Sequence, residues 1–189
     1  MIYDNKPPGV DRYGSWMQTF TGGVFWPMDP RAEEVHIADI AHALSLQCRY
    51  AGHCERFYSV AEHSVYVSHE VPAEHALTAL LHDATEAYCV DVPRPIKGYL
   101  DNYEAIEWRL WRAVAARFGL PDEMPPVVKV ADNAVLLAEA AQIVKPHPLP
   151  WAVEGTPADV VIECLPPWQA EAFFMRRFEE LTLQRSLAI

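Results

Sequence analysis

Apolar residues recur every three or four positions along most of the chain, and this spacing is the period of a helix with one buried face. Ile37, Ile40, Ala41 and Leu44 show it near the start of the first such stretch. The pattern predicts a helix that begins near residue 35, followed by helices over residues 60–70, 73–89, 102–118, 127–144 and 169–183.

Other stretches depart from this period. Aromatic and β-branched residues on both sides of Thr21-Gly22-Gly23 predict a short β-hairpin within residues 16–26. Residues 49–59 are polar and aromatic, which predicts a loop. Pro93 and Pro95 exclude a helix from residues 91–97, because proline removes a backbone donor and biases its neighbours to extended geometry. Six prolines predict an irregular segment over residues 146–167.

These elements predict a mostly α fold, with one helical bundle and a small β element. Residues 1–34 form an N-terminal extension that contains the hairpin, and residues 35–189 form the helical domain. The dense aromatic residues of the extension either line a ligand pocket or pack against the helices, and we favour packing. Within the predicted 102–118 helix, one set of apolar residues suits either the core or an interface between copies: Ile106, Leu110, Trp111 and Val114.

Composition and charge narrow the functional classes. The 189 residues are 51% hydrophobic, which allows one sizeable core and excludes disorder. A net charge of −11 gives no surface for long nucleic acid, although a metal ion and a few local cations can still hold one phosphate group. With no membrane-spanning apolar run and no secretory signal pattern, we expect a cytoplasmic protein without a membrane partner. The four cysteines form no Cys-x-x-Cys pair, so we expect them to be reduced.

The candidate chemistry centres on His82 and Asp83, which follow apolar residues in the middle of the predicted 73–89 helix. Burying an imidazole and a carboxylate there is costly unless they have partners. His63 and Asp132 lie in two other predicted helices, and helical bundles build metal sites from inward side chains of facing helices. A lone histidine or aspartate is usually unremarkable, so the combination is what predicts a divalent metal ion.

The order of these residues resembles the HD-domain superfamily of metal-dependent phosphohydrolases. Three motifs extend the likeness: Ser-Val-Ala-Glu-His-Ser around His63, His-Asp-Ala-Thr-Glu-Ala-Tyr at the centre, and Asp-Val-Pro-Arg-Pro-Ile-Lys after it. They are similar to the bacterial 5′-deoxynucleotidase branch, which also includes short phage and bacterial (deoxy)nucleoside triphosphohydrolases. The likeness covers residues 37–139 and implies that residues 35–189 form an HD-type helical phosphohydrolase domain.

The resemblance also implies roles for the residues that match its motifs. Glu86 would position the attacking water or handle its proton. Asp91 would lie near the sugar or the reacting phosphate. The implied metal ligands are His63, His82, Asp83 and Asp132.

Four further positions would contact the substrate. Lys97 and Arg49 match phosphate-binding cations, and Tyr50 stands where the nucleotidases carry a tryptophan that touches the base or sugar. His53 would approach the phosphate, as an extra histidine does in some triphosphohydrolases. The spacing from Arg49 to His63 is shifted slightly from the family pattern, and the extension and the 146–167 segment are additions. Substrate identity is therefore not carried over.

The expected activity is metal-dependent hydrolysis of phosphate esters of small (deoxy)nucleotides, either monophosphates or triphosphates. One alternative is a phosphodiesterase for cyclic or short dinucleotides, although such relatives often carry more histidines. Another is a non-catalytic metal-binding HD domain, which the presence of Glu86 and Lys97 disfavours. The ligands suit Mn²⁺, Fe²⁺, Co²⁺, Ni²⁺ or Zn²⁺, and Mg²⁺ would accompany a triphosphate. Relatives are commonly dimers or larger, so we expect a homodimer or a higher homo-oligomer.

Overall fold

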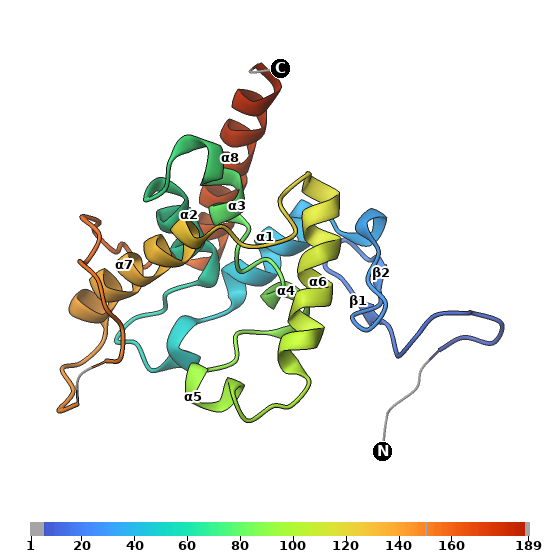
Figure 1. Ribbon diagram of the computed structural model, residues 1–189, viewed down its shortest axis with the longest axis horizontal. Helices are drawn as coiled ribbons and strands as arrows, with labels where there is room; N and C mark the ends of the chain where they lie inside the picture. Colours follow the sequence, from blue (N-terminus) through green and yellow to red (C-terminus); the bar gives the residue numbers. More distant parts are fainter. Residues whose placement is uncertain (1–5, 150, 188–189) are drawn as a thin grey trace.

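Helix α2 (Val60–His69) lies at the centre of a helical bundle. It packs against α1 (Ile37–Leu46), α3 (Ala76–Leu80), α7 (Pro126–Ile143) and α8 (Pro167–Leu187). The computed structural model describes residues 6–149 and 151–187, and Figure 1 shows the arrangement. Every residue of α2 before His69 is buried, so the polar side chains of this helix must find partners inside the protein.

The predicted mostly α fold with a small hairpin is confirmed. Beside α2 and the four helices around it, the described chain contains one two-stranded antiparallel sheet near its N-terminus and several further helices. The remaining elements are β1 (Met17–Gln18), β2 (Val24–Phe25), α4 (Glu86–Cys89), α5 (Arg94–Lys97), α6 (Tyr103–Phe118) and the 3-10 turns Ala32–Glu34, Arg49–Gly52 and Ala73–His75.

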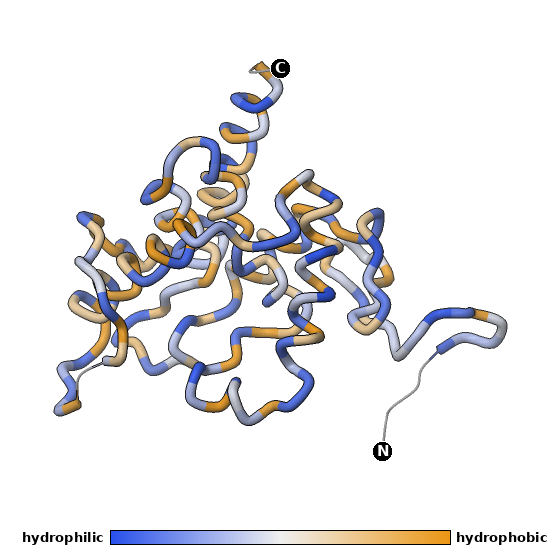
Figure 2. The backbone as a smooth tube through the Cα atoms, viewed as in Figure 1, coloured by the Kyte–Doolittle hydropathy of each residue, from blue (hydrophilic) through white to orange (hydrophobic). Residues whose placement is uncertain are grey.

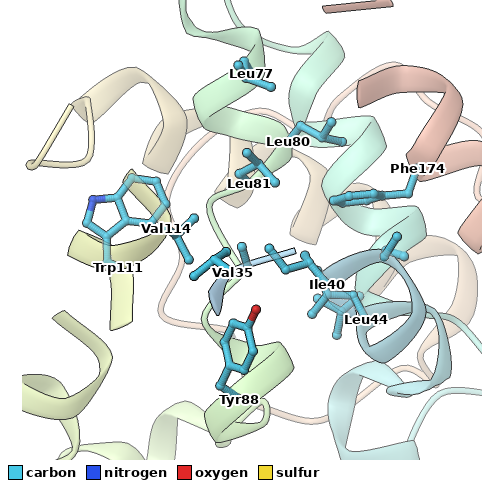
Figure 3. Close-up of a cluster of buried hydrophobic side chains, with 14 of the residues drawn as sticks. Val35, Ile40, Leu44, Leu77, Leu80, Leu81, Tyr88, Trp111, Val114 and Phe174 are labelled. Carbon is cyan, nitrogen blue, oxygen red and sulfur yellow. The ribbon is translucent and has the colours of Figure 1, made fainter. Parts of the chain in front are cut away.

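The main core forms where α1, α3 and α8 meet. Ile40 and Leu44 of α1 cluster with Leu80, Leu81 and Phe174, and all five side chains are fully buried (Figure 3). Burying each of them stabilises the fold by about 1.5–3 kcal/mol. Hydrophobic and hydrophilic residues alternate along α8 in Figure 2, as expected for a helix with one buried face.

The hairpin is attached to the helices by a buried carboxylate. Asp39 of α1 accepts hydrogen bonds from the backbone N–H of Thr21 at 2.7 Å and from its hydroxyl at 3.1 Å. Phe25 is buried and stacks on Tyr88, with 3.8 Å between ring centroids. These contacts agree with the packing interpretation of the aromatic residues, although Phe20 stays exposed.

The predicted continuous helix over residues 73–89 is wrong. The chain instead forms a 3-10 turn, then α3, then a turn over residues 81–85, then α4. The His82 ring explains the interruption: its Nδ1 lies 2.7 Å from the Ala79 carbonyl oxygen. Backbone bonds there tighten to three-residue spacing, as in Ala84 N–H to Leu81 O at 3.0 Å.

The exclusion of helix from residues 91–97 is also wrong. Arg94–Lys97 forms the single turn α5, with Pro93 as its N-cap and Pro95 within its first two positions. The first N–H groups of a helix have no partner inside the helix, so proline costs nothing there. Two prolines therefore begin this turn rather than prevent it.

The longer helices lie close to their predicted bounds. Gly119 ends α6 in the left-handed conformation with φ 63°, as its position before Pro121 leads one to expect. Helix α8 runs four residues beyond the predicted end, to Leu187. Arg185 anchors that last turn, because its guanidinium donates to the carbonyl oxygens of Phe118 and Gly119 at 2.9 Å.

Several other predictions can be compared with the described residues. The residues described between 144 and 166 form no helix or strand, as predicted for the proline-rich segment. Leu110, Trp111 and Val114 belong to the core. The cysteines are free and half-buried. None of the described helices is both long enough and apolar enough to span a bilayer.

Candidate functional site

Three elements bring a histidine pair and an aspartate to one point. His63 comes from α2, His82 from the turn after α3, and Asp132 from α7. One ligand atom from each lies within 4.8 Å of the others, which is close enough to hold a metal ion. The Nε2 atoms of both histidines are buried and find no hydrogen-bond partner within the described structure. Two orphaned imidazole nitrogens beside a carboxylate fit a divalent transition metal.

Asp83 borders the same group. Its Oδ2 lies 3.2 Å from His82 Nε2 and 3.8 Å from His63 Nε2. The turn over residues 81–85 allows these neighbours in sequence to approach one point, where a regular helix would separate them by about 100°. All four predicted metal ligands therefore lie together.

The far nitrogen of each ring has an oxygen partner. His63 Nδ1 lies 2.6 Å from Glu139 Oε1, and His82 Nδ1 lies 2.7 Å from the Ala79 carbonyl oxygen. A carbonyl can only accept, so Nδ1 of His82 carries a hydrogen, and Nε2 is the ring nitrogen that faces the metal group. This is the arrangement by which proteins orient histidine ligands of metals.

Electrostatics at this group favour a cation. Burial and the Arg49 charge would lower the pKa of His63, but Glu139 and Asp132 outweigh them and raise it to about 9. Burial would raise the pKa of Asp83 and Asp132, yet the nearby histidines hold both well below their usual range. The field that keeps a proton on His63 would also favour a metal cation in its place.

Two further predicted residues lie near this group. Glu86 is almost fully buried, and its Oε2 has no partner among the described atoms. Burial, followed by the charges of Asp83 and Asp91, raises the pKa of Glu86 well above its usual range. Asp91 is half-buried, and burial raises its pKa too. Burial therefore favours the protonated form of both carboxylates.

Arg49 and Tyr50 reach the site through an unusual turn. Tyr50 and Ala51 have φ of 57° and 49°, in the left-handed region that favours glycine, and Gly52 follows at 80°. Arg49 is buried, with Nη1 3.7 Å from Asp83 Oδ2. The sequence indicated a loop here but not this conformation.

Glu139 is the residue that sequence reasoning missed. It is fully buried on α7, and it faces Arg49, Tyr50, Tyr58 and His63. Burial would raise its pKa, but Arg49 and His63 lower the pKa of Glu139 to about 2, so it stays ionised. A signal existed: Glu139 follows Asp132 by two helical turns and so shares its helix face.

Two predicted substrate contacts are not at the metal group. The His53 side chain is exposed, and its backbone N–H donates to the Tyr50 carbonyl oxygen at 2.9 Å. Lys97 Nζ lies 2.7 Å from Glu107 Oε1 and 5.1 Å from the centroid of the Tyr103 ring. Lys97 must exchange this carboxylate for a phosphate if it is to bind substrate.

A cavity of about 440 Å³ opens onto the metal group. His82, Asp83 and Asp132 form one part of its wall, and Trp108 and Trp111 offer indole rings elsewhere. Its other lining residues include the carboxylates of Glu104, Glu107, Asp122 and Glu123, with Lys129 as a cation. A small molecule with a flat apolar part would fit this volume and reach the metal group.

Two known proteins resemble the chain over most of its length. The uncharacterized protein YfdR of Escherichia coli is 40% identical over 177 residues, which cover 92% of this chain and 99% of YfdR. An uncharacterized protein of Rhodobacter capsulatus is 32% identical over 200 residues, covering 92% of this chain and 98% of that protein. No family model matches the chain.

Proposed function

The chain belongs to the same family as YfdR of Escherichia coli, and we propose that it is an HD-domain phosphohydrolase that hydrolyses phosphate esters of small (deoxy)nucleotides. The names of the relatives state no activity, so the support comes from the site. The observation that carries it is the group of His63, His82 and Asp132, in which both imidazole Nε2 atoms are buried without a hydrogen bond. His82 and Asp132 also line a cavity of about 440 Å³.

The ligand set fits a resident divalent ion. His63, His82, Asp83 and Asp132 would hold it. When bound, such an ion polarises a phosphoryl oxygen and lowers the pKa of a coordinated water towards neutrality. Mn²⁺, Fe²⁺, Co²⁺, Ni²⁺ and Zn²⁺ all suit imidazole and carboxylate ligands.

The residues of the chain would supply the other parts of the reaction. Arg49, buried beside Asp83, would donate to a phosphate oxygen and offset its charge. Lys97 would join it after leaving Glu107. Glu86, whose pKa burial raises well above its usual range, would position the attacking water or handle its proton.

The test is a hydrolysis assay on metal-stripped protein with Mn²⁺ or Co²⁺ added back. Nucleoside mono-, di- and triphosphates and their deoxy forms are incubated separately, and the products are separated. We expect metal-dependent release of orthophosphate from monophosphates or of intact triphosphate from triphosphates. Glu86→Gln should abolish turnover while the metal stays bound, and Glu62→Gln, which changes another buried carboxylate, is the control.

Two outcomes would contradict this function. If protein shown to bind Co²⁺ hydrolysed no nucleotide, the protein would instead be a non-catalytic metal-binding domain. Hydrolysis of cyclic or dinucleotide phosphodiesters alone would replace the nucleotidase with a phosphodiesterase.

A further inference from the structure

The carboxylate of Glu139 divides its two oxygens between two parts of the site. Oε1 accepts hydrogen bonds from the Tyr58 hydroxyl at 2.8 Å and from His63 Nδ1 at 2.6 Å. Oε2 accepts from the Tyr50 hydroxyl at 2.5 Å and from Arg49 Nε at 3.2 Å. One oxygen therefore serves a metal ligand, and the other serves the turn that carries the candidate phosphate-binding arginine.

The Glu139 carboxylate is fully buried, and all of its hydrogen-bonding capacity is filled. Glu139 has no exposed surface, and an ionised carboxylate away from water is costly unless its lone pairs are filled. Four donors fill them here, which matches the accepting capacity of one carboxylate. A glutamine at this position could not accept all four hydrogen bonds, because its NH2 group would face two of the donors.

The residues that donate to Oε2 belong to a turn whose backbone conformation is unfavourable without outside contacts. Tyr50 and Ala51 both lie in the left-handed region, where a side chain is disfavoured. Such conformations persist only where the surroundings determine them. The Tyr50 hydroxyl and the Arg49 Nε, on adjacent residues at the start of this turn, both donate to the same oxygen.

We propose that Glu139 is a positioning residue that couples metal binding to phosphate binding, by fixing the His63 ring through one oxygen and the Arg49–Tyr50 turn through the other. The phosphate half of this assignment rests on the proposed function, whereas the metal half does not. Glu139 touches neither the ion nor the substrate and acts through the residues that do.

A second buried carboxylate provides the matched control. Glu62 on α2 is also fully buried, and it accepts from the Tyr66 hydroxyl at 3.0 Å and from the backbone N–H groups of Cys164 and Leu165 at 3.0 and 2.8 Å. Cys164 and Leu165 belong to the proline-rich segment and Tyr66 to α2, and none of the three is a site residue. Glu62→Gln therefore reports the cost of altering a buried carboxylate without altering the site.

The first experiment compares Co²⁺ binding by Glu139→Gln and Glu62→Gln, with folding checked by circular dichroism. Loss of a partner behind a metal ligand costs about 10- to 100-fold in metal affinity. We expect Glu139→Gln to raise the Co²⁺ Kd by this factor and to change the visible Co²⁺ spectrum. Glu62→Gln should leave both unchanged. A wild-type Kd and spectrum in Glu139→Gln would overturn the proposal.

The second experiment separates the two oxygens and remains informative if Glu139→Gln does not fold. Tyr58→Phe removes one donor on the Oε1 side, and Tyr50→Phe removes one on the Oε2 side. We expect Tyr58→Phe to weaken Co²⁺ binding and Tyr50→Phe to raise KM with little change in Co²⁺ Kd. If Tyr58→Phe and Tyr50→Phe changed the Co²⁺ Kd and KM to the same extent, the two oxygens of Glu139 would not have separate roles.

The two experiments also distinguish failure of this proposal from failure of the proposed function. If the wild-type protein hydrolyses no nucleotide, the Co²⁺ Kd and spectrum still decide whether Glu139 positions His63. If the wild-type protein is active and Tyr50→Phe keeps the wild-type KM, the coupling to phosphate is wrong while the hydrolase stands.

Discussion

The metal side and the phosphate side of the site balance their charges differently. On the metal side, His63 and His82 each keep a buried nitrogen without a partner in the part of the chain that is described. On the phosphate side, Arg49 is paired with Glu139 and Lys97 with Glu107. An ion on the metal side would replace the proton of His63 and the Lys129 ammonium, which lies 2.5 Å from Asp132 Oδ2. On the phosphate side, a phosphate must compete with the carboxylates of Glu139 and Glu107.

This difference predicts where substitutions will have large effects. Removing a ligand from the metal side deletes an interaction that nothing replaces. The Lys97–Glu107 pair on the phosphate side is partly exposed, and such surface pairs contribute only about 0.2–1 kcal/mol. Metal affinity should therefore be far more sensitive to substitution of a ligand than substrate affinity is to substitution of Lys97 or Glu107.

The largest effect is expected from His82→Ala. The substitution removes one of the two imidazole nitrogens from the group of three ligand atoms, so the metal content after dialysis should fall to background. Mass spectrometry of the metals in the purified protein measures it. His53→Ala, which changes an exposed histidine, is the control. Retention of metal by His82→Ala would remove His82 from the ligand set.

Metal affinity should rise with pH up to about 9. The pKa of His63 is about 9 in the metal-free protein, compared with about 6.5 for an unperturbed histidine. Below pH 9 a metal must displace that proton, so its apparent affinity should fall by about tenfold for each pH unit. Competition titrations with Co²⁺ between pH 6.5 and 9 measure the slope. A flat profile would mean that His63 is already neutral.

Glu107→Gln should strengthen substrate binding. It removes the carboxylate that holds Lys97 at 2.7 Å, and the value of an exposed ion pair corresponds to a fall in KM of about two- to fivefold. Lys97→Ala should raise KM instead. KM is measured on the nucleotide that the hydrolysis assay identifies, with Glu104→Gln as the control. A higher KM for Glu107→Gln would place Lys97 outside the phosphate site.

The smallest effect is expected at His53. Its side chain is exposed and away from the metal group, so His53→Ala should change kcat and KM by no more than about twofold. Steady-state kinetics on the same substrate provide the measurement. A tenfold loss of activity would restore the interpretation of His53 as a phosphate contact.

Hydrophobic spacing was sufficient to predict the long helices, and the Gly-Gly turn with its aromatic and β-branched neighbours was sufficient to predict the hairpin. The spacing failed at residues 81–85, where the His82 ring contacts the Ala79 carbonyl oxygen and the helix is interrupted. The proline rule failed at α5, because the effect of a proline depends on its position in the helix turn. The first error arises from a local side-chain contact, and the second from the position of a residue within its turn.

The candidate site also contains residues that the sequence could predict and residues that it could not. Motif order was enough to bring His63, His82, Asp83 and Asp132 together, since each lies on an inward position of its element. The pairing of Lys97 with Glu107 depends on how α6 packs beside α5, which no single segment encodes. The role of Glu139 could not be predicted, because its four donors come from a 3-10 turn, a loop and α2.

The attachment of the hairpin has a consequence for truncation. Asp39 binds the hairpin turn, and Phe25 covers Tyr88 inside the main core. Arg12 holds the extension itself together through ion pairs to Asp29 and Glu34. A chain cut back to the helices would expose Tyr88 and leave the buried Asp39 without its donors. The extension is therefore a part of the folded core and not a removable arm.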